Sequence, residues 1–237
     1  AAAAGIGAAT GLAQALGVEH AFFNTLRAPG GTFGNRNFLA HLAAAAVPLL
    51  AYLVLTVRRT TASWAAALAL GSAAAALVMT RSRAGWLAAI AGASMMLLAG
   101  VVARRSAGIP IARSRIALML MMAVCGAVAA VVVPTTLEWR SDSPYVDTLG
   151  NLANYREGSG RGRLLQYQNS LQLTRRHPLL GVGPGNWALR YGEVAPRGDP
   201  SFARNDVVPL NPWPSSDWVA LASERGIPAV LAAALLA

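Results

Sequence analysis

The sequence predicts an all-α fold: a polytopic bundle of transmembrane helices with a large extracytoplasmic loop that contains an amphipathic helix. The chain is 55% hydrophobic and has a mean hydropathy of +0.44, values typical of integral membrane proteins. Apolar runs without Asp, Glu or Arg, each long enough to cross a hydrocarbon core, lie at 38–57, 62–79, 84–103 and 116–134. A long hydrophilic segment follows them, at 135–216.

These runs divide the chain into four parts. Residues 1–37 are expected to hold the end of a preceding helix and an outer loop; a cleavable signal peptide is the alternative for 1–17, although that stretch has no basic n-region. Residues 38–134 hold four transmembrane helices with short loops, and 135–216 form a large periplasmic loop. Residues 217–237 begin a further transmembrane helix, and because their apolar part is too short to span alone, we expect a fragment of a longer protein.

The charge pattern predicts the orientation in the membrane. The net charge of +10 comes entirely from arginine, which a GC-rich genome would also explain. Counting crossings, the short loops of one face, near Arg58 and in 104–115, carry six arginines, and those of the other face carry four. The positive-inside rule makes the first face cytoplasmic. Residues 31–37, 80–83 and 135–216 then lie on the periplasmic side of a bacterial inner membrane, and arginines divided between two faces exclude nucleic acid as a partner.

The large loop contains a predicted amphipathic helix at 163–176. Its apolar residues recur at roughly helical spacing, at Leu164, Leu165, Tyr167, Leu171 and Leu173. We expect this helix to lie on the membrane or over the bundle of spans. His177-Pro178 ends it, and a Gly-rich turn follows at 179–186.

Two pairs of arginines are candidates for binding an anion. Arg81 and Arg83 occupy a short outer hairpin between two spans, the place where a lipid-linked phosphate would lie. Snorkelling of these side chains to headgroup phosphates is the equal alternative. Arg161 and Arg163 stand at the start of the loop helix, where guanidinium groups and backbone amides can act together on an anion; a solvated helix start is the alternative.

Two further residues are candidates for a general base. His177 follows Arg175 and Arg176, which disfavour the protonated imidazole, although a structural hydrogen bond at a helix end is the more frequent role. Asp217 lies at the membrane boundary and serves either as a helix N-cap or as a base near the arginines. The three histidines lack metal-ligand spacing and the single cysteine, Cys125, lies in an apolar run, so neither a metal nor another cofactor is expected.

Several motifs follow one another along the chain. They are Gly31-Thr32-Phe33-Gly34-Asn35-Arg36-Asn37, Thr80-Arg81-Ser82-Arg83-Ala84-Gly85, Arg163 with Tyr167, His177-Pro178-Leu179-Leu180-Gly181-Val182-Gly183-Pro184-Gly185-Asn186, and Glu224-Arg225-Gly226-Ile227. In this order and topology they resemble the O-antigen ligase / O-antigen polymerase superfamily of polytopic membrane glycosyltransferases. The resemblance covers about residues 30–230.

The resemblance implies transfer or polymerisation of a glycan from an undecaprenyl-pyrophosphate carrier onto an acceptor hydroxyl of a glycan or lipid. It places this reaction at the periplasmic face of the lipid bilayer, without a metal. Negative charge develops on the departing pyrophosphate, and arginines preorganised at the membrane surface can stabilise it. Arg83 and Arg163 are expected to take this role, with Arg81 and Arg161 in support.

One position departs from the superfamily pattern, which is His, then Asn, Ser or Gln, then nine residues and Gly. Counting back from Gly226 places Ser215 where the histidine belongs, so Asp217 or His177 is the expected substitute base. The alternative is a non-catalytic membrane subunit that binds lipid-linked glycan for surface polysaccharide assembly or export. A transporter ranks third, because it predicts polar or broken helices at mid-bilayer and the four apolar runs contain no ionisable residue except His41.

Overall fold

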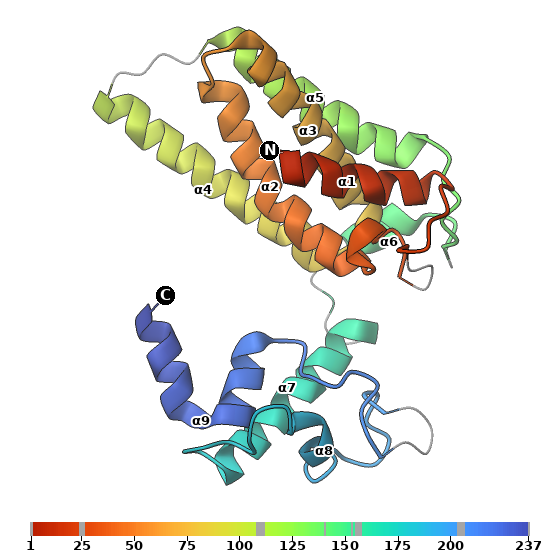
Figure 1. Cartoon of the computed structure of the whole chain (residues 1–237), viewed down its shortest axis with the longest axis vertical. Coiled ribbons are helices and arrows are strands. Elements are labelled where there is room, and N and C mark those ends of the chain that lie inside the picture. Colours follow the sequence, from red (N-terminus) through yellow and green to blue (C-terminus); the bar gives the residue numbers. More distant parts are fainter. Residues whose placement is uncertain are drawn as a thin grey trace. The chain divides into compact units, whose positions relative to one another are not determined.

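The computed structural model consists of helices and loops throughout the part of the chain that it describes. It describes residues 2–23, 27–107, 112–139, 141–152, 154, 158–202 and 207–236, and no β-strand lies among them. The chain divides into two compact units, Ala1–Leu152 and Ala153–Ala237 (Figure 1).

The first unit is a bundle of helices (Figure 1). Its long helices are α2 Arg36–Thr56, α3 Thr60–Thr80, α4 Arg83–Ala107 and α5 Arg113–Val132, and each is long and apolar enough to cross a membrane. Its short elements are α1 Ala2–Ala15, the 3₁₀ helix η1 Gly31–Phe33 and α6 Pro144–Gly150. With α9 of the second unit, five described helices meet the length and composition of a span, so the predicted polytopic all-α fold is confirmed.

Helix α3 forms the centre of the bundle. Helices α1, α2 and α5 pack along it, and α4 packs on α2. Small residues dominate its buried positions, which lets the neighbouring backbones approach closely without a hydrophobic driving force between helices. One close approach is between Gly71 of α3 and Gly126 of α5, where an added Cβ on Gly126 would overlap the Gly71 carbonyl.

One end of the bundle gathers polar loops. The Oε1 atom of Gln14, in α1, accepts hydrogen bonds of 2.8 Å from the backbone amides of Gly30 and Gly31. The amide of Thr136, just after α5, donates to the carbonyl of Ala15 over 2.9 Å. These bonds bring the residues before α2 and the segment after α5 to the same end of the unit.

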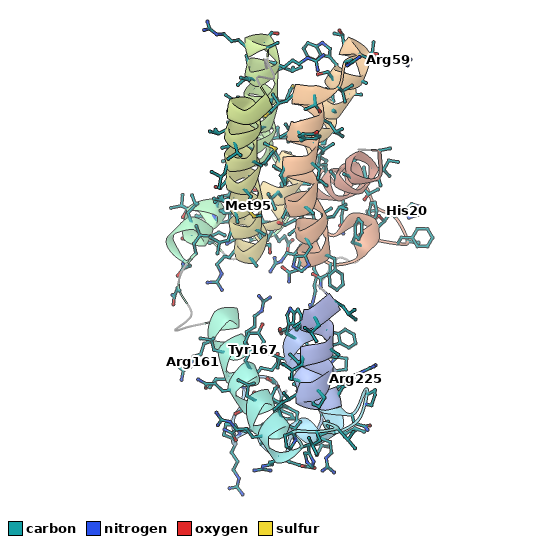
Figure 2. The ribbon with its side chains drawn as sticks, turned by 90° about the vertical axis from the view of Figure 1, so that its left-hand side faces the viewer. His20, Arg59, Met95, Arg161, Tyr167 and Arg225 are labelled. Atoms are coloured by element: carbon teal, nitrogen blue, oxygen red, sulfur yellow. The ribbon has the colours of Figure 1, made fainter. Side chains whose placement is uncertain are left out.

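The opposite end of the bundle is closed by Arg115, at the start of α5. Its guanidinium donates to the carbonyl oxygens of Val54, Val57 and Arg58, where α2 ends. Carbonyls at a helix C-terminus lack partners within the helix and carry partial negative charge, so a cation stabilises them. Arg59 marks this end in Figure 2.

The second unit contains α7 Gly158–Arg176, α8 Trp187–Tyr191 and α9 Asp217–Leu236. Helix α9 is broken at Gly226, whose φ of 80° and ψ of 176° are not helical. The turn after α7 fills the break with backbone hydrogen bonds. From donor to acceptor these bonds are Val182 to Ser223 (2.9 Å), Gly183 to Glu224 (2.9 Å) and Ile227 to Pro178 (2.8 Å).

Helix α7 is present as predicted, and within the second unit it buries a mainly polar face. Leu164 and Leu171 are 43% and 47% exposed, and apart from Leu173 the buried positions are polar: Gln166, Asn169, Ser170 and Thr174. These side chains have partners within the unit. Asn169 Nδ2 donates to Asp199 Oδ2 over 2.8 Å, and Trp187 Nε1 donates to Ser170 Oγ over 2.9 Å. Satisfied hydrogen bonds allow this polar face to be buried, while Leu164 and Leu171 stay exposed on the surface of the unit.

Candidate functional site

The hairpin between α3 and α4 contains an arginine in an unusual backbone conformation. Arg81 ends α3 in the left-handed region, with φ 53° and ψ 26°, and its amide donates to the Val78 carbonyl over 3.0 Å. Among the described residues it is the only non-glycine with a positive φ. Because glycine adopts this conformation more easily, an arginine here indicates that its side chain has a use.

The Arg81 guanidinium shares an indole ring with a second arginine. Its Cζ lies 4.7 Å from the ring centre of Trp139, and Cζ of Arg36 lies 5.7 Å from the same centre. Arg81 Nε also donates to Thr148 Oγ1 of α6 over 3.0 Å. Burial, and then the positive charge of Arg36, lower the pKa of Arg81, while Asp147 acts against this. A bound anion would relieve the repulsion between the two cations, so this place favours one.

Arg36, Arg81 and Trp139 line a cavity of about 1270 Å³ in the first unit. We call it the Trp139 cavity. Its wall carries two carboxylates, Glu19 and Glu138, together with other polar groups that include Gln14, His20 and Thr136. It is larger than the roughly 300–1,000 Å³ of ordinary small-molecule pockets, so it has room for more than one sugar or phosphate group.

Arg83 has different surroundings from Arg81. It is the first residue of α4, it is not part of the cavity wall, and its Nη1 donates to the carbonyl of Asn151 over 2.7 Å. The two arginines of the predicted hairpin site are thus close along the chain, but only one of them lines the cavity.

In the second unit the middle of α7 lies beside the start of α9. Tyr167 Oη donates to the Ser215 carbonyl over 2.8 Å, and Gln166 Oε1 accepts from the Ser215 amide over 2.9 Å. Figure 2 shows Tyr167 pointing from α7 towards α9. Both bonds use the backbone of Ser215, and the residue is exposed, so its side chain is free to face solvent. Position 215 is the one at which the superfamily pattern has histidine.

The two loop arginines leave the first turns of α7 in different directions. Arg163 lies one turn before Gln166, about 5 Å along the helix axis, and is exposed. Arg161 is also exposed, but it lies on the side of α7 away from α9 (Figure 2). Of these two, Arg163 is therefore the one on the same face of α7 as Tyr167, four residues later.

Asp217 lies close to Ser215, and His177 does not. Asp217 is the first residue of α9 and is exposed, while the capping role falls to Ser216, whose Oγ accepts from the Val219 amide at 3.5 Å. His177 follows the last turn of α7; from Tyr167 to His177 the helix advances roughly 15 Å. Its amide bonds to the carbonyls of α7 as a continuation of the helix.

Glu224 has a structural role at the break in α9. Its Oε1 accepts from the backbone amide of Trp187 over 3.3 Å, and its carbonyl accepts from Gly183. The Glu-x-Gly-Ile motif therefore coincides with the break and with the turn that fills it. No group of three or more His, Cys, Asp or Glu among the described residues is placed to hold a metal ion.

A family model described as O-antigen ligase matches residues 66–234, well over half of the chain. The chain belongs to the O-antigen ligase family. No curated protein and no solved structure matches it. Membership of this family indicates a membrane protein that functions in O-antigen ligase/polymerase-like glycan transfer. This process involves a lipid-linked glycan.

The O-antigen ligase match covers only part of the arginine and tryptophan group at the Trp139 cavity. It includes Arg81, Trp139 and the pairing of α7 with the start of α9, but it begins after Arg36. The sequence alone did not associate Arg36 with Trp139. Trp139 follows the fourth apolar run, a position typical of an interfacial aromatic anchor, so its contact with two arginines could not be predicted.

Proposed function

We propose that this member of the O-antigen ligase family transfers or polymerises a glycan from an undecaprenyl-pyrophosphate carrier onto an acceptor hydroxyl, at the periplasmic face of the bacterial inner membrane. The proposal is supported mainly by the pairing of α7 with α9, in which Tyr167 and Gln166 bond to Ser215 inside the family region. Arg163 precedes Tyr167 by four residues, and Asp217 follows Ser215 by two. A cation for the leaving group and a carboxylate for the acceptor are the two parts that a metal-independent transfer needs.

In this reaction the acceptor oxygen forms a bond to the anomeric carbon, and the bond from that carbon to the pyrophosphate oxygen breaks. The acceptor proton passes to a base, and the pyrophosphate leaves with the bonding electron pair. Arg83 and Arg163 stabilise the charge that develops on the pyrophosphate, with Arg81 and Arg161 in support. A guanidinium suits this role because its planar N–H groups match phosphate oxygens in pairs.

Asp217 is the base that this proposal prefers. It is exposed and stands two residues after Ser215, whose backbone is fixed by Gln166 and Tyr167. Its carboxylate can accept the acceptor proton without disturbing the helix cap, which Ser216 provides. His177 is the second candidate, at the other end of α7.

The test uses full-length protein in liposomes, with a lipid-pyrophosphate-linked oligosaccharide and a lipid A–core or glycan acceptor. Arg83→Ala and Arg163→Ala should each lower turnover about 100-fold or more, as loss of a charge-stabilising donor does. Asp217→Ala should do the same through loss of the base, by at least about 100-fold. Arg190→Ala is the matched control, since it removes an exposed loop arginine whose 2.8 Å ion pair with Glu193 is also exposed, and it should leave turnover unchanged.

The outcomes separate the assignments. Loss of turnover in Arg83→Ala but not in Asp217→Ala moves the base to His177. Turnover that survives in both Arg83→Ala and Arg163→Ala contradicts the assignment of the pyrophosphate site.

A non-catalytic subunit that binds lipid-linked glycan for polysaccharide assembly or export is the second candidate function. The observation that favours it is Ser215, a residue without a basic side chain at the position of the expected histidine. This function predicts that the wild-type protein binds the lipid-linked oligosaccharide, that binding depends on Arg83, and that no turnover follows when the acceptor is present.

A further inference from the structure

The Trp139 cavity contains charged groups that the proposed reaction does not use. Arg36 has no role in that reaction, yet its guanidinium lies over the same indole ring as that of Arg81. Arg36 comes from the start of α2, Arg81 from the end of α3, and Trp139 from the segment after α5. Three distant parts of the sequence therefore build one cationic wall.

The geometry leaves this wall able to bind an anion. A guanidinium over an aromatic face directs its N–H groups outward from its edge, and Arg81 engages Thr148 through Nε. Two cations that share one ring repel each other, and burial adds to the cost of charging Arg81. An oxyanion bound between them would reduce both costs.

The rest of the cavity indicates which anion fits. Glu19 and Glu138 also line the cavity, where they would repel a densely charged pyrophosphate but accept hydrogen bonds from hydroxyl groups. Gln14 and Thr136 add further polar contacts. A ligand with one carboxylate and many hydroxyls satisfies the arginines and the carboxylates together, and the cavity volume of about 1270 Å³ leaves room for neighbouring sugars.

We propose that the Trp139 cavity is a subsite for a sugar residue that carries a carboxylate, within the glycan of the substrate. The inference rests on the proposed function only in taking the ligand to be a glycan. The carboxylate lies between Arg36 and Arg81, and the hydroxyls of the sugar face Glu19 and Glu138. The protein therefore distinguishes acidic from neutral glycans at the Trp139 cavity, where Arg81, which has only a supporting role in the proposed reaction, acts together with Arg36.

Binding is measured by calorimetry on the detergent-solubilised full-length protein, with oligogalacturonate and a hyaluronan oligosaccharide as probes. Oligogalacturonate whose carboxyl groups have been reduced to alcohols is the neutral control, and inorganic pyrophosphate is the competing anion. At least one acidic probe should bind, and the reduced probe should bind about tenfold more weakly or worse, as expected for loss of a charge-assisted hydrogen bond. Binding should also weaken as salt is added.

Variants locate the probe in the cavity. Arg36→Gln should weaken binding of the acidic probe about tenfold, and Arg190→Gln, a matched loss of one exposed arginine, should not. Glu138→Gln removes a nearby negative charge, so it should strengthen binding about two- to fivefold. This gain keeps the test informative if Arg36→Gln fails to fold.

The contrary outcomes are equally definite. No binding of either acidic probe, equal binding of the reduced probe, or binding that is insensitive to both Arg36→Gln and Glu138→Gln overturns the proposal. Pyrophosphate that binds in an Arg36-dependent manner and displaces the acidic probe assigns the cavity to the carrier instead. Because binding is measured without turnover, a protein that transfers no glycan can still bind the acidic probe, and the two proposals can fail separately.

Discussion

At the scale of single residues, Arg81 couples an unfavourable backbone conformation to a side chain with several contacts. A non-glycine residue in the left-handed region loses roughly 1–2 kcal/mol relative to glycine. The Thr148 hydrogen bond and the Trp139 contact offset part of this. Two substitutions at position 81 can separate the free-energy cost of the backbone conformation from the contribution of the side-chain contacts.

Arg81→Gly and Arg81→Ala are expected to differ in stability. Both lose the side-chain contacts, worth about 1 kcal/mol for the hydrogen bond, but only glycine relieves the strain of φ 53°. Thermal unfolding in detergent should therefore show Arg81→Gly close to the wild type and Arg81→Ala about 1–2 kcal/mol less stable. Equal stabilities of the two variants would show that the conformation at position 81 costs nothing.

Ser215→His is expected to change activity without changing the fold. The contacts of Ser215 to α7 use its backbone, and the side chain is exposed, so an imidazole can be accommodated. If a histidine serves as base here, turnover in liposomes should rise, and it should then no longer require Asp217. An unchanged rate, with an unchanged melting temperature, would show that the base does not act from position 215.

The sequence could identify single residues at this scale but not their partners. Arginines beside apolar runs are conspicuous, so Arg81 and Arg83 could be chosen on that ground, whereas Arg163 is a candidate because of its place at the start of a predicted helix. The contact that joins Arg36 and Arg81 to Trp139 depends on how the helices pack, which no local pattern specifies.

At the scale of elements, α9 is the helix that departs most from an ideal span. Gly226 and Pro228 were visible in the sequence, yet only the structure shows a break that the turn after α7 fills. Position 226 can hold only glycine for two reasons. Its φ is 80°, and an added Cβ would overlap the carbonyl of Leu179.

Gly226→Ala and Gly185→Ala form a matched pair. Gly185 also has a positive φ, of 76°, but nothing lies within 4 Å of an added Cβ. Gly185→Ala should therefore cost about 1–2 kcal/mol from strain alone. Gly226→Ala adds an overlap with backbone and should cost more than about 3 kcal/mol. Limited proteolysis of the loop and thermal unfolding would measure both, and equal effects would contradict the proposed fit of the turn into the break.

The elements also show what hydrophobic patterns in the sequence can and cannot predict about helices and their packed faces. Long apolar runs must be helical in a bilayer because every backbone group needs a partner, so α2 to α5 could be predicted from hydropathy. Helix α7 lies in a polar loop, where hydrogen bonds rather than apolar area decide the face packed within the unit, and the leucine pattern does not identify that face.

At the scale of the whole molecule, the family membership and the five span-length helices establish a membrane protein, and its orientation remains a prediction. Asp142 and Thr61 are exposed in the loop after α5 and at the start of α3, at opposite ends of the first unit. They provide sites for testing which end faces the periplasm.

Cysteine labelling in spheroplasts can decide the orientation. In a Cys125→Ala background, Asp142→Cys should react with a membrane-impermeant maleimide in intact spheroplasts. Thr61→Cys should react only after the membrane is disrupted, because the arginine-rich loops are predicted to be cytoplasmic. The reverse pattern would place the Trp139 cavity in the cytoplasm and contradict a periplasmic reaction.

The backbone hydrogen bonds between the turn after α7 and the break in α9 have a consequence for how the large loop can evolve. Residues 178–183 and 223–227 are joined by backbone hydrogen bonds. The hydrogen bonds of Gln166 and Tyr167 to the Ser215 backbone fix a further point of the loop. Tyr191 and Ser215 are therefore held within the unit, as is Asp199 between them, whose Oδ2 accepts hydrogen bonds from Asn169 and Tyr191. Doubling a loop between such fixed points costs only about 0.6 kcal/mol in closure entropy. Insertions there can reshape what the protein recognises while Arg163 and Asp217 keep their positions.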